Sequence, residues 1–190
     1  MKRVIAGLAV VVAGAGLAAC SSSTSPPSLS TALKHAKQTV SGAGVHQFVP
    51  TGTSQKFSVA LPTTAGYDSA ALDPNHPGFT KQSWVVDYGK VYQDVTVFVG
   101  VSATAAKALA LQFRGTPPAM TSIADVSGHP AWDWVGTGAA AHAYVAYITA
   151  AMAHAENLVV LDGRVVYGVW SAGLPASANA AFIHSFSVQG

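Results

Sequence analysis

Apolar and polar residues alternate at every second position in several stretches of this chain, which is the pattern of β-strands. The first stretch begins at Phe57, where Val59 and Leu61 continue the apolar face until Pro62 ends it. The segment 62–81 carries three prolines and two glycines without a sustained period. We therefore expect a long loop there.

Further strands are expected at 84–86, 91–101 and 141–150 on the same ground. The clearest is 91–101, where five of the odd-numbered positions are valine and the even-numbered ones, such as Asp94 and Thr96, are mixed. We expect its odd-numbered face to be buried and its other face to be only partly covered. The alanines of 141–150 would also suit a helix, but the alternation favours a strand.

Turn residues between apolar stretches predict two hairpins. One turns at 127–130, Ser-Gly-His-Pro, and the other at Asp162-Gly163. The strands that flank these turns are 123–126, 131–135, 158–161 and 164–170. Because Asp-Gly suits a type I′ turn, we expect Asp162 and Gly163 both to take positive φ.

Apolar positions that recur every three or four residues predict helices. The clearest is 102–114, which Gly115 and the prolines beyond it should end. A second helix is expected at 177–185, with Ala181 among the residues of its apolar face. A short helix is expected at 31–40.

The first 19 residues have the composition of a secretory signal peptide, with Lys2 and Arg3 followed by 16 uncharged residues. Sixteen residues are fewer than the roughly 20 that a membrane-spanning helix needs, which argues against an uncleaved transmembrane segment. The tetrad Leu17-Ala18-Ala19-Cys20 resembles a bacterial lipobox. That resemblance implies a diacylglyceryl thioether on Cys20 and cleavage before it, and two or more acyl chains anchor a protein stably. The alternative is an ordinary signal peptide with an incidental cysteine.

Cleavage before Cys20 would leave 171 of the 190 residues, with eight basic and eight acidic side chains. A neutral mature chain has no net charge to attract nucleic acid. Residues 20–45 begin with a Ser- and Pro-rich stretch and are expected to form a flexible tether, and residues 46–190 a single domain with its own core. Cys20 is the only cysteine in the sequence, so no intramolecular disulfide is expected.

The order of the expected elements resembles that of a known family. With the turn at 128–131, Gly-His-Pro-Ala, and the segments 163–167 and 182–186, it resembles the PsbP-like sandwich, which also occurs in LpqN-type lipoproteins of mycobacteria and their relatives. The resemblance covers residues 57–188 and implies an α+β fold in which helices flank an antiparallel sheet. It implies a domain that binds proteins or small ligands, and it carries over no catalytic residue.

Motifs that would identify an enzyme are absent from the sequence. The histidines, at positions 35, 46, 76, 129, 142, 154 and 184, do not have the spacing of a zinc site. No Gly-x-Ser-x-Gly, Ser-x-x-Lys or phosphate-loop motif occurs, so we expect no metal, no cofactor and no catalytic residue. The alternative is an envelope hydrolase built from distant residues, for example a serine with His129 and Asp133.

The tryptophans have two interpretations. Trp132 and Trp134 fall on one face of an expected strand, and Trp84 and Trp170 lie on two others. Their rings would suit an aromatic floor for a lipid, a sugar or a peptidoglycan-derived ligand. We favour core packing beneath the helices, because so apolar a sheet must be covered.

These features together predict a lipoprotein on the outer face of the cell membrane, attached through Cys20. Its folded part is expected to be a non-catalytic binding or adaptor domain for an envelope ligand or protein partner.

Overall fold

The computed structural model describes residues 38–67, 70–87, 92–115, 120–137, 140 and 154–189. Cys20, most of the predicted helix at 31–40 and the predicted strand at 141–150 lie outside these ranges. The elements follow in the order β1 (Gln38–Val40), β2 (Gly44–Phe48), β3 (Lys56–Leu61), β4 (Ala65–Tyr67), β5 (Ala71–Leu72), β6 (Phe79–Asp87), β7 (Tyr92–Gly100), α2 (Ala103–Gly115), β8 (Thr121–Val126), β9 (His129–Thr137), β10 (His154–Asp162), β11 (Val165–Ala172), α4 (Ala176–His184) and β12 (Ser187–Gln189).

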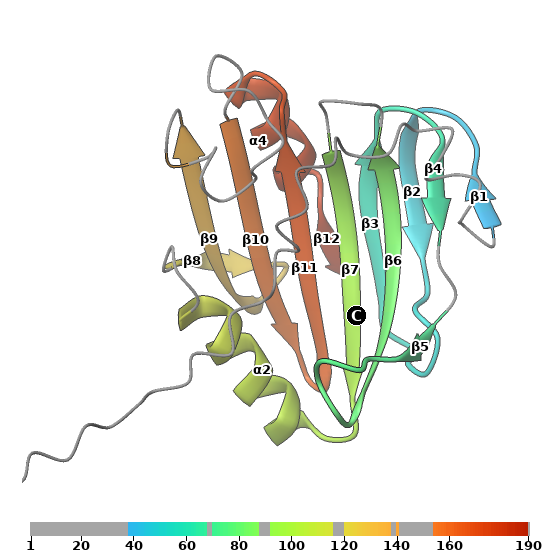
Figure 1. Cartoon of the computed structure of the whole chain (residues 1–190), viewed down its shortest axis with the longest axis vertical. Helices are drawn as coiled ribbons and strands as arrows, with labels where there is room; N and C mark the ends of the chain where they lie inside the picture. Colours follow the sequence, from blue (N-terminus) through green and yellow to red (C-terminus); the bar gives the residue numbers. More distant parts are fainter. Residues whose placement is uncertain are drawn as a thin grey trace, which may run out of the picture.

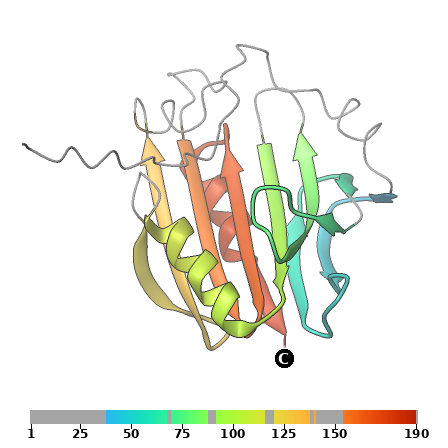
Figure 2. The same ribbon diagram turned by 60° about the horizontal axis from the view of Figure 1, so that its bottom comes forward.

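The described strands form two antiparallel sheets (Figure 1). The large sheet has nine strands in the order β1-β4-β6-β7-β11-β10-β9-β8, with β5 beside β6. The small sheet has three, in the order β12-β3-β2. Figure 2 shows α2 and α4 on opposite sides of the large sheet. The fold is therefore α+β, with an antiparallel sheet flanked by helices, as the sequence predicted.

One face of the large sheet, here called the α4 face, carries Val95, Val97 and Val99 of β7. It packs against α4 and the small sheet, and the alternating residues of β3 reach it as predicted, with Phe57 and Val59 fully buried. Four rings surround Phe57 with centroids 5.0–5.7 Å away, those of Phe48, Trp84, Tyr167 and Phe186. This aromatic cluster joins the two sheets.

The opposite face, here called the α2 face, carries Phe98 and Trp132 and is covered by α2 through Ala106 and Leu109. The sequence predicted that this side of β7 would be only partly covered. That prediction was wrong, because Phe98 is 7% exposed and Thr96 is 8% exposed. β7 lies in the interior of the sheet with a layer on each side, so both of its faces are buried.

Two segments differ from the sequence prediction. The stretch 62–81 is not one loop, because it contains β4, β5 and the first residues of β6, which begins at Phe79 and not near 84. Strands of two or three residues are too short to show a period, so sequence alone misses them. Gln38–Val40 forms strand β1 beside β4 and not the end of a helix, so paired strands begin within the stretch predicted as tether.

Both predicted hairpins are confirmed, but their turns differ in detail. Ser127 and Gly128 take φ of 54° and 81°, and His129 already belongs to β9. In the second hairpin Asp162 pairs with Val165, so the central turn residues are Gly163 and Arg164. Gly163 has φ of 56°, whereas Asp162 stays in the strand region and does not take the positive φ that we predicted.

The helices lie close to their predicted positions. Ser102 caps α2, since its Oγ accepts a hydrogen bond of 3.1 Å from the amide of Ala105. In α4 the buried residues are Asn179, Phe182 and Ile183, whereas Ala181 is exposed. The predicted apolar face of α4 was thus wrong at Ala181, because a polar residue, Asn179, faces the sheet.

Candidate functional site

The described histidines do not converge on one site. Within the described ranges no three His, Cys, Asp or Glu side chains lie close enough to hold a metal ion. Instead, three histidines each lie beside a different carboxylate, in three separate parts of the fold. Cys20, His35 and His142 lie outside the described residues.

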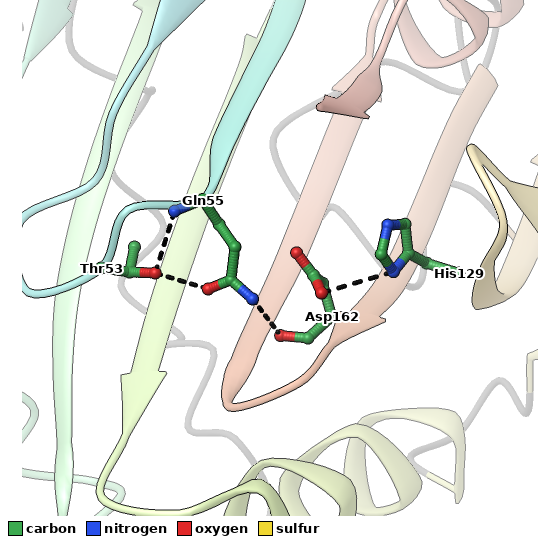
Figure 3. Close-up of polar contacts among 4 residues, drawn as sticks. All are labelled: Thr53, Gln55, His129 and Asp162. Atoms are coloured by element: carbon green, nitrogen blue, oxygen red, sulfur yellow. Dashed lines mark hydrogen bonds and ion pairs between the residues drawn. The ribbon is translucent and has the colours of Figure 1, made fainter. Parts of the chain in front are cut away.

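The first pair is His129 and Asp162, at the ends of β9 and β10 on the α4 face (Figure 3). His129 Nδ1 lies 3.4 Å from Asp162 Oδ1, and the side chains are 25% and 12% exposed. From the other side Gln55 Nε2 donates to the Asp162 carbonyl at 3.3 Å, and Thr53 holds the Gln55 side chain. The contacts fasten the loop before β3 and the start of β9 to the β10–β11 turn.

This arrangement does not fit the pairing of His129 with Asp133, which was the example given for a hydrolase built from distant residues. Both residues lie on the α4 face of β9, but four positions separate them, which is about 13 Å in an extended strand. His129 faces Asp162 instead. Among the described contacts no serine hydroxyl is hydrogen-bonded to His129.

The second pair, Asp73 and His76, lies in the connection between β5 and β6. His76 Nδ1 lies 2.6 Å from Asp73 Oδ2, while Asp73 Oδ1 accepts a hydrogen bond of 3.0 Å from the Asn75 amide. Burial alone would raise the pKa of Asp73, but the hydrogen bonds from His76 and Asn75 outweigh it and lower that pKa. The imidazole meets the rings of Phe98 and Phe113 nearly at right angles, with centroids 5.6 and 5.5 Å away. The pair therefore fixes this connection against β7 and α2.

The third group lies on the α4 face beside the end of α4. His184 Nε2 is 3.7 Å from Glu156 Oε1, and Asp133 is the neighbouring carboxylate on β9. Burial raises the pKa of Glu156; His184 opposes the rise and Asp133 adds to it. Burial also raises the pKa of Asp133, although a hydrogen bond from its own backbone amide and the nearby His184 both lower it. Both carboxyl groups thus bind a proton more readily than carboxyl groups in water.

The tryptophans do not form one floor. Trp84 is 3% exposed and lies on the α4 face, stacked on Tyr67 with centroids 5.4 Å apart. Trp132 and Trp134 share the α2 face as predicted, and Trp132 is 9% exposed beneath α2. Core packing accounts for Trp84 and Trp132. Trp134 and Trp170 are partly buried and lie on either side of Asn157 in the register.

Sequence reasoning missed all three carboxylate–histidine pairs. Asp73 and His76 had a local signal in the sequence. An aspartate often accepts a hydrogen bond from the backbone amide two residues later, which forms an Asx turn. Glu156 and His184 belong to elements that only the tertiary fold brings together, so no spacing in the sequence indicates their contact. His129 and Asp162 were both noted as turn residues, but of two different hairpins.

Comparison with known proteins assigns no family. No protein-family model matches this chain, and no curated protein is significantly similar to it. A solved structure from Bacteroides thetaiotaomicron VPI-5482 is similar over 80% of this chain, at 10% sequence identity and a TM-score of 0.36. This chain spans 50% of that protein. Within the described ranges no helix is long and apolar enough to cross a membrane.

Proposed function

We propose that this protein is an exported lipoprotein, anchored to the outer face of the cell membrane through Cys20. Its α+β domain, which we propose to be PsbP-like, acts as a non-catalytic binding or adaptor domain for an envelope ligand or protein partner. The observation that carries the proposal is the tetrad Leu17-Ala18-Ala19-Cys20 at the end of a charged and then apolar leader. A Ser- and Pro-rich stretch separates that cysteine from the first described strand, which begins at Gln38.

The polar side chains support a binding role over a catalytic one, because they are engaged in holding the fold. His76 faces the Asp73 carboxylate, which also accepts a hydrogen bond from the Asn75 amide. His129 faces Asp162, whose backbone carbonyl accepts a hydrogen bond from Gln55 Nε2. The hydroxyl of Ser171 is fully buried and donates to Asn179 Oδ1 at 2.7 Å. A nucleophile needs access to substrate and a base within hydrogen-bond reach, and Ser171 has no access.

The anchor is tested by Cys20→Ala in a bacterial host that processes lipoproteins. The unaltered protein should incorporate labelled fatty acid and enter the detergent phase on phase separation, because acyl chains dominate its partitioning. Cys20→Ala should do neither, while its urea midpoint stays that of the unaltered protein, since Cys20 lies well before the first described strand. Ser21→Ala is the matched control and should keep both label and partitioning. Detergent-phase recovery of Cys20→Ala would contradict the proposal.

A hydrolase is the second candidate, and the Asp73–His76 pair is the observation that favours it. In hydrolytic triads a carboxylate bonded to Nδ1 holds the imidazole so that Nε2 can take the proton of a nucleophile. The 2.6 Å contact in this protein has that form. Against it, the His76 side chain is only 10% exposed, and its contacts with the described residues include no hydroxyl.

The two candidates differ in their reaction with a fluorophosphonate probe, which labels activated serines. We expect no labelling above that of heat-denatured protein, because the described Asp–His pairs have no serine in contact. Labelling of the folded protein that disappears in His76→Gln would establish the hydrolase. His46→Gln is the control, since His46 is only partly buried and lies on the edge strand β2.

A further inference from the structure

Helix α4 rests on the large sheet through an apolar side and a polar side. Phe182 and Ile183 are 5% and 2% exposed and belong to the core between the sheets. Asn179, one turn earlier, is 1% exposed and faces a polar part of the α4 face. Sheet positions beneath a helix are usually apolar, so the polar side has to be accounted for separately.

The polar side is a row of residues in register across three strands. Glu156 of β10 pairs with Ser171 of β11, which pairs with Gln93 of β7. Gln93 Nε2 donates to Ser171 Oγ at 3.2 Å, and Ser171 Oγ donates to Asn179 Oδ1 at 2.7 Å. Asn179 Nδ2 donates to the Leu174 carbonyl at 3.1 Å, just before the helix. Hydrogen bonds thus connect α4 with the neutral part of the row.

Glu156, at the end of this row, lacks such compensation. It is 5% exposed, and no described residue donates a hydrogen bond to its carboxylate. The nearest group that can carry a positive charge is the His184 imidazole, whose Nε2 lies 3.7 Å from Glu156 Oε1 and whose side chain is 75% exposed and therefore screened by solvent. A buried carboxylate without donors is costly, and a second carboxylate nearby increases the cost.

The titratable groups that face Glu156 come from each element around it. Asp133 lies on β9 and His184 on α4. His154 lies two residues earlier on the same face of β10, and the partner on β11, Ser171, is uncharged. Burial and the charge of Asp133 both raise the pKa of Glu156, and together they outweigh His184, which lowers it.

We infer that α4 is a pH-dependent latch, held tightly on the sheet while Glu156 carries a proton and loosened when Glu156 and Asp133 are both ionised. A protonated Glu156 has no charge to bury, and it gains an O–H donor in a row otherwise held by hydrogen bonds. The folded state binds the proton more strongly than the unfolded chain, so this contribution is complete at acid pH. It is lost as the pH rises above the ordinary carboxyl range through the raised pKa.

The position of α4 gives the latch a wider effect. The helix connects β11 of the large sheet with β12 of the small sheet. β12 pairs with β3, whose Phe57 belongs to the aromatic cluster. A loosened α4 therefore weakens the hold of the small sheet on the large one. The inference does not depend on the lipoprotein proposal.

Amide hydrogen exchange of the full chain in neutral detergent tests the latch. After correction for intrinsic exchange, protection of residues 176–184 should be severalfold lower at about pH 8 than at about pH 4. In Glu156→Gln, protection should be independent of pH and at least as high as the acid value. Asp125→Asn is the matched control, because Asp125 is an exposed acid of the same sheet, and it should follow the unaltered protein.

Three results would overturn the inference. The first is protection of α4 that does not change with pH in the unaltered protein. The second is a pH dependence that survives in Glu156→Gln but disappears in His184→Gln, which would assign it to the imidazole. The third is an equal loss in β7, which would mean global unfolding. If Glu156→Gln does not fold, Asp133→Asn takes its place. In Asp133→Asn the protection of α4 should still fall with rising pH, but by less than in the unaltered protein. A pH dependence equal to that of the unaltered protein would also overturn the inference.

Discussion

Val97→Asp is expected to abolish folding. Val97 is fully buried on the α4 face, in the centre of the large sheet, between Gln82 of β6 and Tyr167 of β11. A carboxylate there would have no counter-charge, and burying one costs about 4 kcal/mol or more. That is a large part of the roughly 5–15 kcal/mol that stabilises a domain. Urea unfolding followed by circular dichroism should show no cooperative transition, or one close to zero denaturant.

Val101→Asp is the matched control, because it makes the same substitution just beyond β7, where the valine is 76% exposed. It should stay within about 0.5 kcal/mol of the unaltered protein. Thr96→Asp does not serve as a control, although the sequence pattern suggested it. Thr96 is 8% exposed and donates to Asp94 Oδ2 at 2.8 Å, so a second carboxylate there would also destabilise. Equal midpoints for Val97→Asp and Val101→Asp would contradict the burial of β7.

Phe57→Ala is expected to destabilise the protein by about 3–5 kcal/mol. The ring of Phe57 is fully buried where the small sheet meets the large one, and it contacts Trp84, Tyr167 and Phe186. Its removal leaves a cavity that these rings cannot fill without moving, which adds to the lost burial. The free energy of unfolding from urea titration measures the loss.

Phe48→Ala is the control for Phe57→Ala. Phe48 stacks on Phe57 with centroids 5.1 Å apart, but it lies on the edge strand β2 and is only partly buried. Its removal opens less of a cavity, so the loss should be under half of that for Phe57→Ala. If Phe48→Ala cost as much, the small sheet would not pack on the large one as described.

Periodicity predicted those parts of the fold that are long and regular. The alternation in 91–101 gave β7 with Val95, Val97 and Val99 on its buried face, but it was wrong at Val101, which lies beyond the strand and is 76% exposed. The three-to-four spacing in 102–114 gave α2. The alternation does not show how many layers pack on the sheet, so it did not predict that both faces of β7 are buried. The small sheet was missed as well, because it joins β3 to β12 across more than half the chain, and such pairing has no local signal.

The polar groups were harder to predict than the fold. The absence of a zinc or serine-hydrolase motif was evident from the sequence, whereas the three carboxylate–histidine pairs were not. Asp162 and His129 meet across the paired strands β10 and β9, and Glu156 meets His184 where α4 packs on the sheet. The burial of Glu156 without a hydrogen-bond donor among the described residues follows from the layering of the fold and not from spacing in the sequence.

Whether the protein is an exported lipoprotein can be read from the mass of the amino-terminal peptide of protein purified from membranes. We expect a peptide that begins at Cys20, lacks residues 1–19, and carries a diacylglyceryl group on the Cys20 sulfur. Its amino terminus would be acylated in hosts that add a third chain. A peptide that still contains residues 1–19, or one with an unmodified Cys20 thiol, would show that the protein is not a lipoprotein anchored through Cys20.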